Sequence, residues 1–217
     1  MKKVVVFDLD GTLTNNDTFV SFLLFVLKKQ PGRWLRTWNL PFATFLHKAG
    51  FRDNTWLKIE FLKSIVGGLS TESIQQIGSQ FSLQLLNSLR QGALAQVDYH
   101  RQQGDLLILA TASPDVYVRH LADHLGFDSW VCTQLSQQPI GYVDGQLIDG
   151  NCYGENKLTK LKTHLESLGY EHIDVGYSDH EADLPLLTFA KRGVAVSPTK
   201  KLAQQCHPNG FEILRWN

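Results

Sequence analysis

Four short apolar runs without polar alternation are typical of strands that are buried on both faces of a parallel sheet. They lie at residues 4–7, 106–110, 173–177 and 193–196. Amphipathic patterns separate the later three runs: residues 116–125 end before Gly126, and residues 156–168 end before Gly169. Alternating strands and helices with short links predict an α/β fold with a doubly wound, Rossmann-like parallel sheet.

The segment between the first and second predicted strands is much longer than a simple crossover connection. About 95 residues separate Asp10 from Leu106, whereas a crossover needs about 10–12. Helical patterns fill this segment at residues 18–29, 56–66 and 70–86, the last capped by Ser70. We therefore predict a mainly α-helical cap, residues 15–94, inserted after the first strand of a core made of residues 1–14 and 95–217. Residues 135–149 predict a β-hairpin that turns at Asp144-Gly145.

Composition and charge narrow the functional classes. Of 217 residues, 43% are hydrophobic and 19% are charged, which is typical of a globular protein. The 21 Lys and Arg balance the 21 Asp and Glu, so the chain has no net positive charge that would attract nucleic acid. We therefore expect no nucleic-acid partner. Three cysteines, far apart and without a CxxC pair, favour a reducing cytoplasm over a disulfide framework. Asp8 and Asp10 interrupt the apolar run near the start, so we expect no secretion signal.

An aromatic segment raises the question of membrane contact. The apolar stretch 18–27 is followed by Trp34, Trp38, Phe42 and Phe45, with Arg33 and Arg36 among them. No uncharged run approaches the roughly 20 residues that span a bilayer, so we expect no transmembrane segment. We expect residues 34–51 to pack within the helical cap, with Trp34 and Trp38 as packing residues. An interfacial helix in peripheral contact with a membrane is the alternative. Composition does not determine the oligomeric state.

Two carboxylates follow the first predicted strand. Asp8 and Asp10 lie at its carboxyl end, where ligands bind in open α/β sheets, and their spacing of two sends both side chains the same way. Two carboxylates at the end of an apolar strand are unfavourable unless a cation or a proton compensates them. An Asp-x-Asp pair is equally typical of a solvated turn. The full run Asp-Leu-Asp-Gly-Thr-Leu-Thr is far more specific.

Further polar residues follow the later strands. We expect the hydroxyl of Thr111, with backbone N–H groups from Ala112 to the next helix, to form a phosphate cradle. Lys157 opens a helix, where it can neutralise both a carboxylate and a phosphate. Asp179 and Asp183 follow the third strand. Taken singly, these are ordinary cap, turn or solvated residues. Together, the carboxylates converge on one sheet edge and predict a Mg²⁺ site that binds a small phosphorylated substrate.

This combination resembles the haloacid dehalogenase superfamily. The four short motifs of that superfamily match in order: Asp8-Leu9-Asp10-Gly11-Thr12, Thr111, Lys157, and Asp179 with Asp183. An insertion between the first two motifs implies the C1-capped subfamily IB, which is similar to phosphoserine phosphatase. Within that branch, the nearest likeness is to the bacterial phosphatidylglycerophosphatase C family. It rests on Asn16-Asp17-Thr18-Phe19, Lys29-Gln30-Pro31, Gly154-Glu155-Asn156-Lys157, Gly176-Tyr177-Ser178-Asp179 and Pro185-Leu186-Leu187.

The resemblance implies a role for each motif residue. Asp8 would attack phosphorus, while Asp10 would protonate the leaving alkoxide and then deprotonate the hydrolytic water. Magnesium would be held by Asp8, the backbone carbonyl of Asp10, and Asp179, with Asp183 supporting its water shell. Thr111 and Lys157 would bind the transferring phosphoryl group.

The resemblance also implies which cap residues read the substrate. Asp17 stands where phosphoserine phosphatases carry a glutamate that binds the substrate ammonium. Arg52 and Lys58 are the candidates for contacting the rest of the substrate. The leading hypothesis is thus a phosphatase that acts through an aspartyl-phosphate on a small metabolite, such as a phosphoserine-like or histidinol-phosphate-like compound.

Three alternatives stay open. The first is a phosphatidylglycerophosphate-type lipid head-group phosphatase at the membrane surface. The second is a signalling module that accepts phosphate on Asp8 and holds it, and the third is a phosphosugar mutase. Asp10 argues against the signalling module, because a long-lived acyl phosphate has no use for an adjacent acid–base group. It also argues against carbon–halogen chemistry, because the dehalogenases of this superfamily lack the second aspartate.

Overall fold

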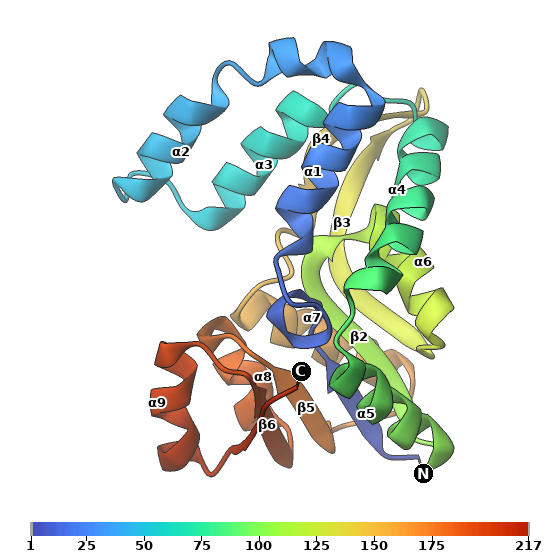
Figure 1. The fold of residues 1–217 in the computed structure, drawn as a ribbon, viewed down its shortest axis with the longest axis vertical. Coiled ribbons are helices and arrows are strands. Elements are labelled where there is room, and N and C mark those ends of the chain that lie inside the picture. The colour runs from blue at the N-terminus through green and yellow to red at the C-terminus, as the bar shows by residue number, and fades with distance from the viewer. Residues whose placement is uncertain (1, 217) are drawn as a thin grey trace.

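The computed structural model describes residues 2–216, and these form one seven-stranded sheet with helices on both faces (Figure 1). The strands are β1 (Val4–Phe7), β2 (Leu106–Pro114), β3 (Ser129–Gln138), β4 (Tyr142–Ile148), β5 (Val175–Ser178), β6 (Arg192–Val196) and β7 (Glu212–Leu214). Their order is β4-β3-β2-β1-β5-β6-β7, and every pair except β3–β4 is parallel. The predicted doubly wound α/β class is confirmed.

Strand β1 lies at the centre of the sheet and is completely buried. Because side chains alternate along a strand, Val5 and Phe7 pack into one hydrophobic cluster, while Val4 and Val6 pack into another on the opposite face. The continuous apolar run therefore reflects burial on both faces. It carries the chain to Asp8 at the carboxyl edge of the sheet, where the next turn begins.

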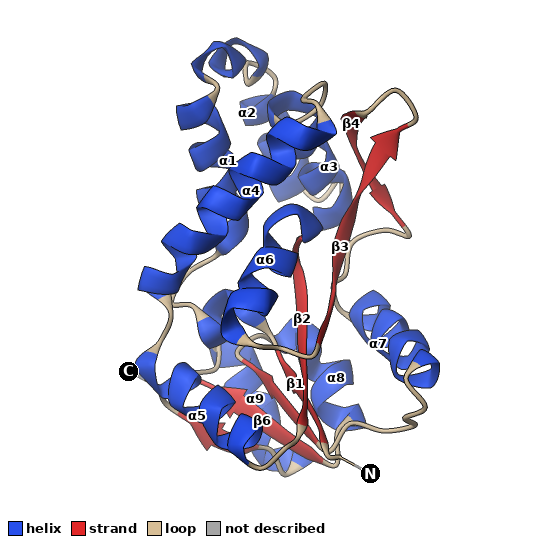
Figure 2. Cartoon of the chain, turned by 90° about the vertical axis from the view of Figure 1, so that its right-hand side faces the viewer, coloured by secondary structure: helices blue, strands red, loops and turns tan. Residues whose placement is uncertain are grey.

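Nine α-helices surround and extend the sheet within residues 2–216 (Figures 1 and 2). They are α1 (Thr18–Lys29), α2 (Leu40–Lys48), α3 (Asn54–Ile65), α4 (Thr71–Leu85), α5 (Gln91–Gln102), α6 (Asp115–Leu125), α7 (Glu155–Ser167), α8 (Leu184–Phe189) and α9 (Lys200–Asn209), with a six-residue 3₁₀ helix at Pro31–Arg36. Helix α1 has the predicted bounds. Ser70 caps α4 through its hydroxyl, which accepts a hydrogen bond from the backbone N–H of Ser73 (3.2 Å).

Helices α1 to α4 lie beyond the carboxyl end of the central strands, in the upper part of Figure 1. The chain leaves the sheet at Thr14 and returns at Leu89, and these two residues form an isolated antiparallel bridge. The predicted boundary at 94/95 falls inside α5, which packs beside the sheet. A separate cap made of residues 15–94 stays a prediction.

The hairpin prediction is wrong in the position of its turn. Strands β3 and β4 pair antiparallel, but the chain turns at residues 139–141, and Asp144-Gly145 lies within β4. Gly145 is needed there for a different reason: a Cβ would overlap the backbone of Lys63 in α3. The hairpin thus leans against the helical region, where the N–H of Gly68 donates to the carbonyl of Val143 (2.7 Å).

Helix α4 packs closely against α6: a Cβ at Gly78 would overlap the backbone carbonyl of Val116.

The segment around α2 is packed less closely and exposes large side chains. The expectation that Trp34 and Trp38 pack inside the cap is wrong: their side chains are 54% and 82% exposed. None of the helices within residues 2–216 is both long and apolar enough to cross a membrane.

Candidate active site

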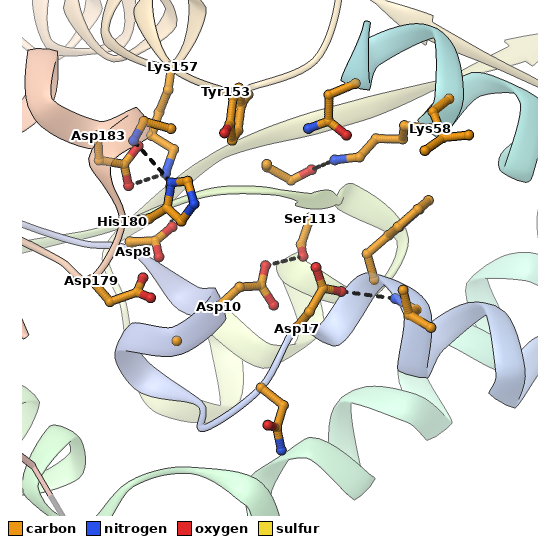
Figure 3. A pocket seen from close by; sticks show the side chains of 18 of the residues that line it. Asp8, Asp10, Asp17, Lys58, Ser113, Tyr153, Lys157, Asp179, His180 and Asp183 are labelled. Carbon is orange, nitrogen blue, oxygen red and sulfur yellow. Dashed lines mark hydrogen bonds and ion pairs between the residues drawn. The ribbon is translucent and has the colours of Figure 1, made fainter. Parts of the chain in front are cut away.

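A cavity of about 640 Å³ opens at the carboxyl edge of the sheet and is lined in part by residues of α1 and α3 (Figure 3). Its floor contains the acidic and basic motif residues Asp8, Asp10, Lys157, Asp179 and Asp183. Its wall contains residues of the helical region, among them Asp17, Phe19, Lys58 and Phe61. The sheet topology explains the floor, because β1 and β5 are adjacent parallel strands and their carboxyl ends meet at one edge.

The turn after β1 brings two carboxylates close together. Gly11 adopts a φ of +80°, and a Cβ there would overlap the carboxylate of Asp179. Only glycine meets both conditions without strain. The buried hydroxyl of Thr12 lies between Asp8 Oδ2 (3.2 Å) and Asp179 Oδ1 (3.3 Å). The run Asp-Leu-Asp-Gly-Thr therefore supplies Asp8, the glycine and the hydroxyl of this contact, and Asp179 reaches it from the end of β5.

Lys157 neutralises part of the floor. Its Nζ lies 2.9 Å from Asp8 Oδ1 and 2.7 Å from Asp183 Oδ2, and all three side chains are buried. Burial lowers the pKa of Lys157, but Asp183 and Asp8 outweigh burial, so the net pKa is raised and the side chain stays protonated. The hydroxyl of Ser178 also donates to Asp183 Oδ2 (2.7 Å), which fixes that carboxylate beneath Lys157.

Asp10 is held by residues that sequence reasoning missed. Its Oδ1 accepts a hydrogen bond from the backbone N–H of Thr18 (2.6 Å), and its Oδ2 accepts one from the hydroxyl of Ser113 (2.7 Å). The hydroxyl of Thr18 in turn lies 2.9 Å from those of Ser113 and Tyr117. Burial, and then the charge of Asp17, raise the pKa of Asp10, although these hydrogen bonds oppose the shift. The first turn of α1 thus positions Asp10.

Thr111 does not line the cavity. Its hydroxyl is fully buried, accepts from the backbone N–H of Ser113 (3.0 Å) and lies 3.4 Å from Asp10 Oδ2. Ala112 and Ser113 line the cavity instead. In the sequence, the only sign of a role for Ser113 is that it is a polar residue two positions after Thr111, and polar residues are common in turns.

Lys58 and Arg52 have different environments. Lys58, on α3, is buried, and its Nζ donates to the carbonyl of Ala112 (2.7 Å) and to Asn151 Oδ1 (2.9 Å). Burial lowers the pKa of Lys58 to about 8. Arg52 does not line the cavity; its guanidinium lies 5.4 Å from the ring centre of Trp56. The structure therefore brings Lys58 to the motif residues and leaves Arg52 outside.

The carboxylates of the floor outnumber its cations. Burial raises the pKa of Asp8 well above its usual value although Lys157 opposes this, and burial raises the pKa of Asp179 to about 6. Within residues 2–216, no three His, Cys, Asp or Glu side chains are grouped as a metal site by themselves. Mg²⁺ does not need three protein side chains as ligands, because one or two carboxylates together with backbone, water and phosphate oxygens are enough to bind it. The donor set fits that ion.

Comparisons with known proteins identify a family and relatives of similar fold. Residues 5–188 match the model of the haloacid dehalogenase-like hydrolase family. A histidinol-phosphatase of Neisseria meningitidis is 26% identical over the full length of both chains. A Bordetella pertussis protein of unknown function superposes with a TM-score of 0.85 at 21% identity, covering 99% of this chain and 98% of the other. A phosphoserine phosphatase with a phospho-aspartyl intermediate analogue superposes with a TM-score of 0.66 at 17% identity, covering 99% and 94%.

Proposed function

We propose that this chain, which belongs to the haloacid dehalogenase-like hydrolase family, is a magnesium-dependent phosphatase. In this proposal, Asp8 carries the phosphoryl group as an aspartyl-phosphate intermediate. The resemblance to the haloacid dehalogenase superfamily, the α/β fold and the enzyme class of phosphomonoester hydrolase are confirmed. The nearer likeness to phosphatidylglycerophosphatase C stays a prediction. The observation that carries the finer proposal is the contact of Asp8 with Lys157 (2.9 Å) in the cavity that Asp10 also lines.

The first chemical step forms a bond between Asp8 Oδ and phosphorus and breaks the bond from phosphorus to the leaving oxygen. Asp10 gives that oxygen a proton, and its raised pKa favours the protonated form that this step needs. Lys157 remains charged beside Asp8 and offsets negative charge on the phosphoryl group.

The second step hydrolyses the acyl phosphate. Asp10, now ionised, takes a proton from water, whose oxygen attacks phosphorus and releases phosphate and the Asp8 carboxylate. Asp8, the backbone carbonyl of Asp10 and Asp179 would hold Mg²⁺, with Asp183 supporting it from its contact with Lys157. Bound there, the ion would supply Lewis-acid stabilisation of phosphoryl oxygens.

The wall of the cavity favours a small substrate that bears an amine. Asp17 lines the cavity and has no cationic partner among the described residues. Its Oδ1 caps α1 through the N–H of Val20 (3.0 Å), which leaves lone pairs for a ligand. Phe19, Phe61 and Tyr153 add apolar surface. A phosphorylated amine such as histidinol phosphate or phosphoserine would complement these groups.

The decisive experiment measures phosphate release from a panel with Mg²⁺. The panel contains phosphoserine, histidinol phosphate, sugar phosphates, nucleotides and a short-chain phosphatidylglycerophosphate. Asp8→Asn keeps the shape of the side chain but removes the nucleophile, so we expect kcat to fall by about 10⁴-fold or more. Asp123→Asn, an exposed change on α6, is the matched control and should retain full activity.

Other outcomes would favour the alternatives. Equal phosphate release by wild type and Asp8→Asn would contradict the proposal. A phosphoenzyme that lasts for minutes would favour the signalling module, an isomerised product would favour the mutase, and selectivity for the lipid would favour the head-group phosphatase.

A further inference from the structure

The outer end of the helical region carries a surface that the proposed chemistry does not use. We call it the basic aromatic patch; it consists of Trp34, Leu35, Trp38, Phe42, Phe45 and Phe51 with Lys28, Lys29, Arg33, Arg36, Lys48 and Arg52. Its residues belong to the end of α1, the 3₁₀ helix Pro31–Arg36, α2 and the turns on either side of α2, and α2 lies at the upper left in Figure 1. Leu35, Trp38 and Phe51 are 85%, 82% and 72% exposed. A gathering of large exposed apolar side chains indicates an interaction surface.

The local structure explains why these side chains point outward. Helix α2 buries only Leu40 and Ala43, on the side that packs against α3, so Phe42 and Phe45 project from the opposite side. The preceding 3₁₀ helix, Pro31–Arg36, has no buried residue. Burial in the fold therefore does not account for the apolar residues of this segment.

The charge of the segment is strongly one-sided. Residues 18–52 contain six of the 21 Lys and Arg and none of the 21 Asp and Glu. None of these six cations is paired with a carboxylate among the described residues. Arg33 and Arg36 both donate to the backbone carbonyl of Gly67, a neutral group, so their charges remain uncompensated. The patch is cationic on a chain without net charge.

We propose that the basic aromatic patch docks on the surface of an anionic lipid bilayer. Tryptophan and other aromatic side chains enter the interfacial region of a bilayer, and neighbouring Lys and Arg meet anionic headgroups. A second copy of the chain is a poor partner, because a symmetric contact would oppose two sets of six cations. Lysine is depleted in the cores of protein interfaces. The proposal does not depend on which phosphomonoester is hydrolysed.

Vesicle binding by the full chain tests this proposal without reference to activity. Cosedimentation should show binding to vesicles of phosphatidylcholine with phosphatidylglycerol and little binding to phosphatidylcholine alone. Binding should weaken in high salt, because screening shortens electrostatic attraction. Brominated lipids should quench tryptophan fluorescence in the wild type, and quenching should be smaller in Trp38→Phe.

Matched variants separate the patch from general effects of charge or hydrophobicity. Lys28→Gln/Lys29→Gln/Lys48→Gln should weaken binding by about tenfold or more. Lys2→Gln/Lys3→Gln/Lys200→Gln removes the same charge from exposed positions elsewhere and should bind like wild type. Trp38→Ala/Phe42→Ala/Phe45→Ala should also weaken binding by about tenfold or more. Leu83→Ala/Ile140→Ala/Leu168→Ala changes exposed apolar residues elsewhere and should not.

Three results would overturn the proposal. The first is no binding of wild type to anionic vesicles, and the second is equal binding by the patch variants and their controls. The third is concentration-dependent self-association that Trp38→Ala/Phe42→Ala/Phe45→Ala abolishes, without vesicle binding, which would assign the patch to a second copy. Because all changed side chains are exposed, unchanged thermal unfolding verifies that each variant is folded.

Discussion

Two buried lysines enter the cavity from opposite sides in Figure 3, and their surroundings differ sharply. Lys157 contacts two carboxylates, Asp8 and Asp183, which raise its pKa. The hydrogen bonds of Lys58 within residues 2–216 go to neutral oxygens, those of Ala112 and Asn151, its Nζ lies 5.0 Å from the ring centre of Phe19, and burial lowers its pKa to about 8. A buried cation is stable when its charge is paired and costly when it is not.

The different surroundings of the two lysines indicate different roles. Lys157 completes the floor before any ligand arrives, because Asp8 and Asp183 would be uncompensated without it. Lys58 keeps an unpaired charge at the wall, where a phosphorylated ligand would supply the missing anion. We infer that Lys157 serves both stability and chemistry, whereas Lys58 mainly serves binding.

The largest expected effect is that of Lys157→Met. Removing one partner of a buried ion pair costs about 3–5 kcal/mol, so the free energy of unfolding should fall by that amount at pH 7. Loss of a donor to the transition state should lower kcat by about 10²–10³-fold. Urea unfolding measures the first effect. The loss of stability should shrink as pH falls, because burial raises the pKa of Asp8 and so favours its neutral form once Lys157 is absent. Lys162→Met on the same helix, at an exposed position, is the control, and an equal loss there would contradict the pairing argument.

Lys58→Met should affect catalysis but not stability. A hydrogen bond to a charged group contributes about 1.5–3 kcal/mol, so kcat/KM should fall by about 10- to 100-fold. The free energy of unfolding should stay within about 1 kcal/mol of wild type, because an unpaired buried charge is removed. The hydroxyl of Thr133 still contacts both acceptors, at 2.7 Å from the Ala112 carbonyl and 2.9 Å from Asn151 Oδ1. A loss of stability as large as that of Lys157→Met would refute the contrast between the two lysines.

The pH dependence sharpens the contrast further. Because the pKa of Lys58 is about 8, kcat/KM of wild type should fall as pH rises through 8, and Lys58→Met should lack this decrease. The folded pKa lies below the ordinary value of 10.5, so the buried charge destabilises the fold below pH 8. That penalty disappears between about pH 8 and 10.5, so wild type should gain stability relative to Lys58→Met in this window. Urea unfolding at pH 7 and pH 9 measures the gain; a constant difference would exclude the lowered pKa.

Asp17→Asn should have the smallest effect. Asp17 is exposed, and exposed ion pairs contribute about 0.2–1 kcal/mol, so the preference for phosphoserine over its analogue without the amine should fall by about two- to fivefold. Asparagine also caps helices, so α1 should remain intact. Kinetics with both compounds measure the preference, and glycerol phosphate, which has no amine, is the control substrate. An unchanged preference would remove Asp17 from substrate recognition.

Local sequence predicted the elements whose signals lie within one segment. The apolar run of β1, the amphipathic pattern of α1 and the capping Ser70 each depend on neighbouring residues, and the structure has all three. The position of the hairpin turn was wrong, because Gly145 is required by the backbone of α3 rather than by a turn. A glycine signal does not reveal which of these two constraints produced it.

The sequence by itself determined the chain's α/β core and the placement of Asp8 and Asp179 at one cavity. Parallel strands put their carboxyl ends at a common edge, so residues that directly follow such strands meet there. Only the tertiary structure decided that Thr18 and Ser113 hold Asp10, that Lys58 enters the wall while Arg52 does not, and that the basic aromatic patch is exposed. These features depend on how separate helices pack against one another, and a short motif carries no information about that packing.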